Sequence, residues 1–102
     1  MTSLLVLYPP PRDADAFELR YRDEHAPMVR AKMAGLRRFS AGRVVGSPGG
    51  EPSFARVAQL DFDSRDALEA ALNSADGQAV VGHALEISTG GPMTVLILEE
   101  DG

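Results

Sequence analysis

The chain contains no cysteine. Disulfide bonds, zinc–thiolate sites, iron–sulfur clusters and thiol nucleophiles are therefore excluded. No G-x-G-x-x-G follows a predicted strand and no P-loop lysine is present, so the sequence offers no nucleotide-type cofactor motif. Glu24 and His25 are neighbours that point about 100° apart on a helix, and no second pair at ligand spacing accompanies them. We therefore expect neither a cofactor nor a metal site.

Long apolar runs are also missing. The run from Leu4 to Tyr8 is far shorter than a membrane span, and it lacks the basic region and cleavage site of a signal peptide. The formal net charge is −5 and the sequence pI is about 4.8, which disfavours partners bound through their phosphates. We expect a cytoplasmic protein with no membrane segment and no nucleic-acid partner.

What remains is the composition of an ordinary folded domain. The 102 residues are 44% hydrophobic and 25% charged, which suits one domain spanning residues 1–102. Asp13 and Asp15 are placed to cap the first helix and Ser64 a later one, and Asn73-Ser74 interrupts the late helical region. The predicted elements are a strand at 3–8, helices at 14–24 and 28–33, strands at 36–46 and 53–63, helices at 64–72 and 75–85, and a strand at 93–98.

This β-α-β-β-α-β order predicts an α+β protein, the split βαβ pattern of a ferredoxin-like sandwich. Helices cover one face of such a sheet and leave the other bare. Residues 4–7 and 95–98 do not alternate apolar with polar side chains, so both faces of these strands favour burial. A second copy of the chain is the simplest cover, and we predict a homodimer with its sheets packed face to face.

Phe17, Tyr21 and His25 recur every four residues and form one stripe on the first helix. Pro27 predicts a break or kink at Ala26, which would leave His25 at a helix end. Histidine exchanges protons near neutral pH, so His25 is the candidate general acid or base. The alternative is structural, because aromatic residues at helical spacing usually belong to a core and a lone histidine is usually packed.

Further motifs accompany this stripe along nearly the whole chain. They are Tyr8-Pro9, His25-x-Pro27-Met28, Gly35-Leu36, Phe62-Asp63-Ser64, Ser74-x2-Gly77-Gln78 and Thr89-Gly90-Gly91. Together with Phe17-x3-Tyr21-x3-His25 they resemble the EthD family, whose name refers to ethyl tert-butyl ether degradation. The resemblance implies a dimeric α+β barrel, in which two ferredoxin-like protomers join their sheets. It also implies an acidic residue in many members where this chain has His83.

For function, the resemblance implies less. EthD proteins are often labelled reductases, and related barrels include monooxygenases, cyclases and isomerases. The first hypothesis is an enzyme, an oxidoreductase or an isomerase or cyclase, acting on a small apolar or aromatic metabolite between the first helix and the sheet. His25 and Tyr21 are its predicted catalytic residues. The predicted substrate-binding residues are Phe17, Met28, Phe39, Phe62 and His83. The alternative is a non-catalytic protein that binds a hydrophobic metabolite.

Overall fold

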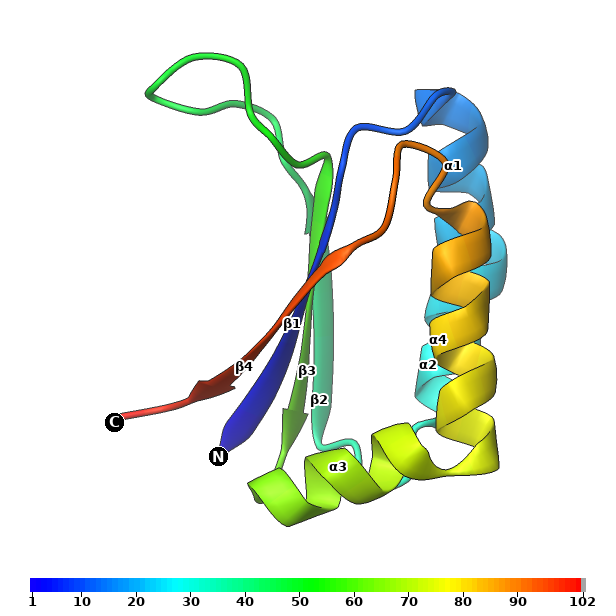
Figure 1. Cartoon of the computed structure of the whole chain (residues 1–102), viewed down its shortest axis with the longest axis vertical. Coiled ribbons are helices and arrows are strands. Elements are labelled where there is room, and N and C mark those ends of the chain that lie inside the picture. Colours follow the sequence, from blue (N-terminus) through cyan, green and yellow to red (C-terminus); the bar gives the residue numbers. More distant parts are fainter. Residues whose placement is uncertain (102) are drawn as a thin grey trace.

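A four-stranded antiparallel sheet carries two long helical rods on one side and a shorter helix across one end (Figure 1). The computed structural model describes residues 1–101. Its strands lie in the order β2-β3-β1-β4, which makes the fold ferredoxin-like, as the sequence predicted. The elements are β1 (Thr2–Tyr8), α1 (Ala14–Arg20), the π-helical turn η1 (Tyr21–His25), α2 (Ala26–Lys32), β2 (Arg38–Arg43), β3 (Arg56–Phe62), α3 (Arg65–Asn73), α4 (Ala75–Ile87) and β4 (Thr94–Glu99).

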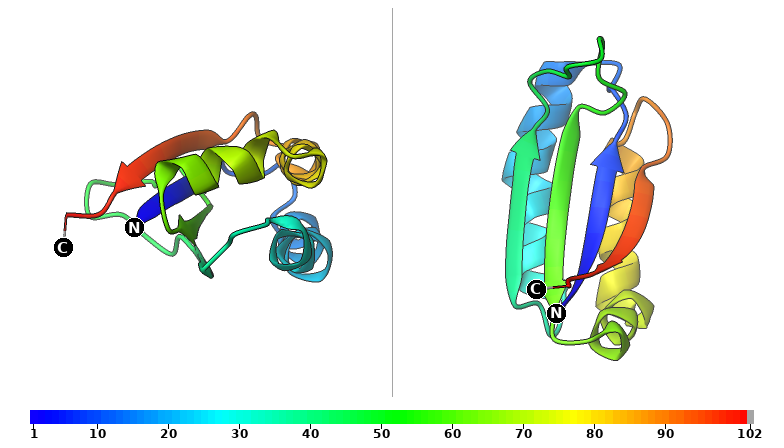
Figure 2. Two further views of the ribbon diagram at one scale, coloured as in Figure 1. Left: turned by 90° about the horizontal axis from the view of Figure 1, so that it is seen from below. Right: turned by 90° about the vertical axis from the view of Figure 1, so that its left-hand side faces the viewer.

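The register of the sheet divides the side chains of β1 between two faces. Leu4 pairs with Leu60 of β3 and with Ile97 of β4, while Leu5 pairs with Gln59 and Leu96. Because side chains alternate along a strand, Leu4, Val6 and Tyr8 face the helices and Leu5 and Leu7 face away from them. The sheet face without helices is turned toward the viewer in the right-hand view of Figure 2.

The first helical region is continuous, and the predicted break at Ala26 is wrong. Ala26 has helical dihedral angles, and its N–H bonds to the carbonyl of Tyr21, five residues back. This π-helical turn already interrupts the four-residue hydrogen-bond ladder. Pro27 then occupies the first turn of α2, where a missing N–H costs little. His25 therefore lies inside a helical rod and not at its end.

Two of the predicted helix caps, Asp13 and Ser64, are confirmed, whereas Asp15 lies in the first turn of α1 and does not cap it. The Asp13 carboxylate accepts the N–H of Ala16 at 3.0 Å, and the Ser64 hydroxyl accepts the N–H of Ala67 at 3.1 Å. Ser74 ends α3 and starts α4, where its hydroxyl accepts the N–H of Gly77 at 2.9 Å. Ser74 thus separates α3, which lies across the end of the sheet, from the long α4, which lies beside the first helical rod (Figure 1).

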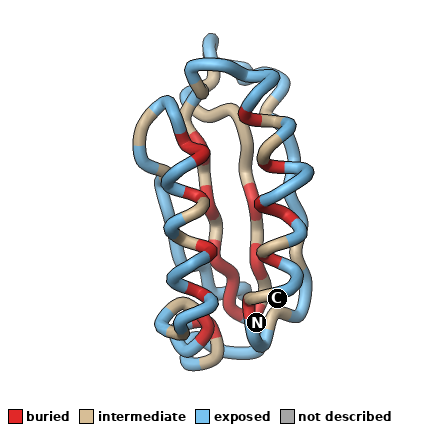
Figure 3. The backbone as a smooth tube through the Cα atoms, turned by 90° about the vertical axis from the view of Figure 1, so that its right-hand side faces the viewer, coloured by how far each residue is buried: buried red, intermediate tan, exposed pale blue. Residues whose placement is uncertain are grey.

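The core lies between the sheet and the two long helical rods, whose buried positions face inward in Figure 3. Phe62 and Leu68 are fully buried in it. By contrast, the side chains of β4 remain exposed, with Leu96 at 50% and Leu98 at 48% of their surface. Within residues 1–101, no helix is long and apolar enough to cross a membrane.

Two glycines of α4 provide a matched test of this packing. A Cβ at Gly77 would lie 1.9 Å from the carbonyl oxygen of Ala71, whereas a Cβ at Gly82 meets nothing within 4 Å. We expect Gly77→Ala to lower the free energy of unfolding by about 2 kcal/mol or more. Gly82→Ala should raise it by about 1 kcal/mol, because alanine favours helix. Urea unfolding measures both, and equal effects would contradict the close approach of α3 to α4.

Candidate functional site

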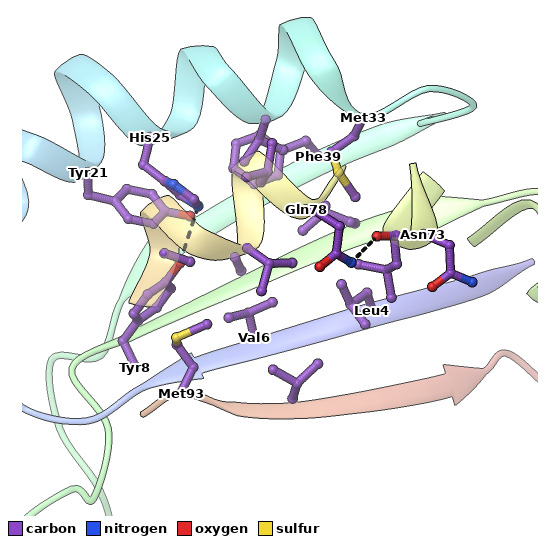
Figure 4. Close-up of a pocket in the computed structure, with 18 residues that line it drawn as sticks. Leu4, Val6, Tyr8, Tyr21, His25, Met33, Phe39, Asn73, Gln78 and Met93 are labelled. Carbon is purple, nitrogen blue, oxygen red and sulfur yellow. Dashed lines mark hydrogen bonds between the residues drawn. The ribbon is translucent and has the colours of Figure 1, made fainter. Parts of the chain in front are cut away.

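An apolar cavity of about 340 Å³ lies between the helices and the sheet (Figure 4). This volume is at the lower end of the range of small-molecule sites. Its wall is formed mainly by aliphatic and aromatic side chains of the sheet, of α2 and of α4. They include Leu4, Val6, Val29, Phe39, Leu60 and Val80. The exposed amides Asn73 and Gln78 lie at one end of the cavity, and three buried polar side chains lie at the other.

The buried polar end consists of Tyr8, Tyr21 and His25, which are 1%, 2% and 4% exposed. Tyr8 is the last residue of β1 and shares the helix-facing side of that strand with Leu4 and Val6. Tyr21 and His25 begin and end the η1 turn, and their rings lie 5.4 Å apart between centroids. The Tyr8 hydroxyl lies 3.3 Å from Nε2 of His25 (Figure 4). Strand and helix thus bring a phenol and an imidazole together inside the cavity.

His83 of α4 meets His25 on the side away from Tyr8. The two Nδ1 atoms are 2.9 Å apart, and the ring planes differ by only 9°. The ring centroids are 5.1 Å apart, much farther than the nitrogens, so the rings meet edge to edge through a hydrogen bond. On its other side, Nε2 of His83 lies 3.1 Å from Oε1 of the half-exposed Glu24.

Arg20 and Glu86 extend this contact at the surface. Nη2 of Arg20 lies 3.1 Å from Oε1 of Glu24 and 2.5 Å from Oε2 of Glu86. Hydrogen bonds from Arg20 and His83 lower the pKa of Glu24, so its carboxylate is ionised at neutral pH. The buried imidazole is thereby linked through one neighbour to a charged group in water.

The hydroxyl oxygen of Tyr21 has no hydrogen-bond partner among the described residues, although it is buried. The guanidinium carbon of Arg56 lies 4.4 Å from the centroid of the Tyr21 ring, and Arg56 forms an ion pair with Glu18. A buried hydroxyl without a partner is costly, and one lining a cavity is free to bond a ligand.

Burial keeps the inner groups uncharged. Burial, together with a smaller effect of the neighbouring His83, lowers the pKa of His25 to about 4. Burial also raises the pKa of Tyr21 to about 12 and moves the pKa of Tyr8 upward. At neutral pH the cavity end therefore presents two phenols and one neutral imidazole, a form of histidine that can accept a proton.

The residues predicted to bind substrate fall into three groups. Phe39 lines the cavity. Phe17, Met28 and Phe62 do not: Phe62 is fully buried, the ring of Phe17 packs 5.3 Å from that of Tyr8, and Met28 packs against the core from outside. His83 is absent from the cavity wall and instead contacts His25. Helical periodicity identified the buried face, but it did not separate core side chains from cavity side chains.

Sequence reasoning missed Tyr8, Asn73 and Gln78 as candidates. A signal for Tyr8 was present, because a tyrosine that ends a strand on the same face as two aliphatic residues places a polar group at the rim of a core. Asn73 and Gln78 lie on either side of the α3–α4 junction, and only the tertiary structure brings that junction to the cavity.

Glu24, His25 and His83 resemble a metal triad in composition but not in geometry. The nitrogens of His25 and His83 face each other, and Glu24 lies on the far side of His83. The three side chains therefore form a line and do not converge on one point. Across residues 1–101, no three His, Cys, Asp or Glu side chains gather as metal ligands.

Fold and site together define a small ferredoxin-like protein with an apolar cavity that ends in two buried phenols and a buried imidazole. The chain belongs to the EthD family, because the model of the EthD domain matches residues 9–84. An uncharacterised 11.0 kDa protein from the thcB–thcC intergenic region of Rhodococcus erythropolis is 31% identical over 101 residues, covering 99% of this chain and 96% of that protein.

Solved structures agree with this assignment. An EthD family protein from Bacillus halodurans C-125 is 36% identical, covers 98% of both chains and superposes with a TM-score of 0.90. An EthD-like protein from Ralstonia eutropha JMP134 is 24% identical, with a TM-score of 0.74 over 96% of this chain and 89% of that one. More distant structures from Jannaschia sp. CCS1 and Thermobifida fusca YX, which share the fold alone, are described as dimeric ferredoxin-like proteins.

The buried neutral His25 makes stability depend on pH. Its folded-state pKa of about 4 lies below the ordinary value of 6.5, so between these values the unfolded chain binds more protons than the folded chain. Stability then rises with pH across this window. Acidification from pH 7 to pH 4 should remove about 3 kcal/mol through His25.

His25→Gln carries no such proton and should lose about 3 kcal/mol less than the wild type over the same acidification. Denaturant unfolding of both proteins at both pH values measures the difference. The carboxylates titrate in both proteins and cancel. Equal losses would show that His25 is not buried in the neutral form.

Proposed function

We propose that this protein is an enzyme that acts on a small apolar or aromatic metabolite, with His25 as its general acid or base. One observation carries the proposal: an imidazole lies at the buried polar end of an apolar cavity with hydrogen-bond partners on both nitrogens. A purely structural histidine has no need of an adjacent cavity. A neutral imidazole beside a ligand-sized space is a proton acceptor placed where a substrate can bind.

Tyr21 is the proposed second catalytic residue. Its unpartnered hydroxyl supports a hydrogen bond to a substrate oxygen, and the Arg56 guanidinium over its ring favours negative charge nearby. Isomerisation, cyclisation and cofactor-independent oxygenation share a first step in which a proton leaves a carbon beside a carbonyl group. A base and an oxygen-binding hydroxyl at one end of an apolar cavity suit that step.

The substrate class follows from the cavity wall. Leu4, Val6 and Phe39 offer contact but no hydrogen bonds, so the bulk of the ligand should be apolar. Its polar group should lie at the Tyr8–Tyr21–His25 end, because an apolar group there would leave the Tyr21 hydroxyl without a partner. A protein that only binds such a molecule would need the same cavity, but it would have no use for a neutral base.

A homodimer is part of the proposal. Leu96 and Leu98 project from the helix-free face of β4 and are about half exposed, beside the partly buried Leu5 of β1. Leu96 pairs with Leu5, so apolar side chains lie side by side on this face of β1 and β4 and form an apolar strip that water solvates poorly. The dimeric descriptions of fold neighbours agree with burial of this strip against a second copy.

Proton abstraction can be tested with 2-tetralone, a bicyclic ketone with acidic C–H groups beside its carbonyl. We expect the protein to accelerate exchange of these hydrogens with deuterium from solvent, followed by NMR. His25→Gln should lower the rate by about 10²-fold while the circular dichroism spectrum is retained. An unchanged rate in His25→Gln would reject His25 as the base, and no acceleration by the wild type would count against enolising chemistry.

The oligomer can be tested by light scattering. The wild type should be a dimer at micromolar concentration, and Leu96→Asp should be monomeric because it buries an unpaired carboxylate in the interface. Val45→Asp is the control, since Val45 is 89% exposed in the loop between β2 and β3. A monomeric wild type, or dissociation by the control alone, would refute the proposed sheet-to-sheet interface.

A further inference from the structure

The hydrogen bonds around His25 have only one consistent direction when both histidines are neutral. The ionised Glu24 can only accept, so Nε2 of His83 must carry the hydrogen. Nδ1 of a neutral His83 is then bare and must accept from Nδ1–H of His25. Nε2 of His25 is bare in turn and accepts from the hydroxyl of Tyr8. Every donor from Tyr8 to Glu24 thus points out of the cavity.

We infer that Tyr8, His25, His83 and Glu24 form a proton relay, through which the protein takes a proton from a hydroxyl or an acidic C–H group of its ligand and binds that ligand as an anion. The inference rests on the proposed function and deepens it. It makes Tyr8 the catalytic residue that meets the ligand. His25 passes the proton on to His83, and the Glu24 carboxylate stabilises the imidazolium that forms.

The step balances. The bond from the ligand to its hydrogen breaks, and that proton joins the oxygen of Tyr8. The original hydroxyl proton of Tyr8 moves to Nε2 of His25, and the Nδ1 proton of His25 moves to Nδ1 of His83. Tyr8 and His25 end neutral, His83 is an imidazolium beside the Glu24 carboxylate, and the ligand carries one negative charge.

Burial explains why the transferred proton should end on His83 and not on Tyr8 or His25. Tyr8 and His25 are 1% and 4% exposed, and burial opposes ionisation of both. The side chain of His83 is 15% exposed and that of Glu24 is 50% exposed. The charged side chains around His83 are Glu24 and, through it, Arg20 and Glu86. A positive charge is therefore least costly on His83, against Glu24.

The ligand anion also has a place at the cavity end. The hydroxyl of Tyr21 has no partner within residues 1–101 and can donate to an anionic oxygen. Arg56 lies over the ring of Tyr21, and its positive charge favours the ionised forms of both Tyr8 and Tyr21, while its ion-pair partner Glu18 acts in the opposite direction on Tyr21. The same charge favours an anionic oxygen held between these two side chains. The relay therefore selects apolar phenols and enolisable ketones over neutral hydrocarbons.

The direction of the relay can be measured without a ligand. Long-range ¹H–¹⁵N correlation spectra at neutral pH should show His25 with its hydrogen on Nδ1 and His83 with its hydrogen on Nε2. In Glu24→Ala, His83 should populate both neutral tautomers, because no carboxylate holds its hydrogen on Nε2. In the matched control Glu86→Ala, the hydrogen of His83 should stay on Nε2. The opposite tautomer of His25 in the wild type would overturn the relay.

Proton uptake can be measured with 4-nitrophenol, whose ionised form absorbs visible light. Near pH 6 the ratio of ionised to neutral probe should be at least about tenfold greater for the bound probe than for the free probe, which corresponds to a shift of about one pKa unit. Tyr8→Phe and Glu24→Ala should remove most of this gain, and Glu86→Ala should not. A probe that binds but stays neutral would refute the relay and leave the pocket intact. A probe that fails to bind would count against the proposed ligand class, while the tautomers still decide the relay.

Discussion

An imidazole buried among apolar side chains must bond both of its nitrogens, and the site is built around this constraint. His25 meets it through Tyr8 on β1 and His83 on α4. These two contacts tie the first helical rod to the sheet and to the second rod. An unpaired nitrogen at this depth would cost about 1–3 kcal/mol, so strand, turn and helix are held in one arrangement. The cavity lies where the three elements meet.

The same constraint sets the electrical character of the cavity. Burial keeps Tyr8, Tyr21 and His25 neutral. The charged side chains lie outside the cavity, with Glu24 on the solvent side of His83 and Arg56 over the ring of Tyr21. Neutral groups in a low-dielectric space exchange protons with little reorganisation when charge develops. The stability of the fold and the proposed chemistry therefore both depend on burial of these polar groups, of which Tyr8 and His25 are hydrogen-bonded and Tyr21 is left free to bond a ligand.

The order of elements could be predicted because its signals are local. Apolar runs, turn clusters and the caps Asp13 and Ser64 lie within a few residues of the structures they produce. The stripe of Phe17, Tyr21 and His25 also follows from spacing alone. Pro27 misled the prediction, because a proline signals a break only where the four-residue ladder would otherwise continue. Here a π-helical turn had already interrupted it.

By itself, the sequence determined the elements, their order, the buried stripe and the family. It could not determine that His83 meets His25, since 58 residues separate them and their contact depends on how α4 packs beside η1. Nor could it separate Phe39, which lines the cavity, from Phe17 and Phe62, which fill the core. A hydrophobic side chain looks the same in sequence whether it meets a neighbour or an empty space. Only the tertiary structure decides which, because that depends on the distance between layers.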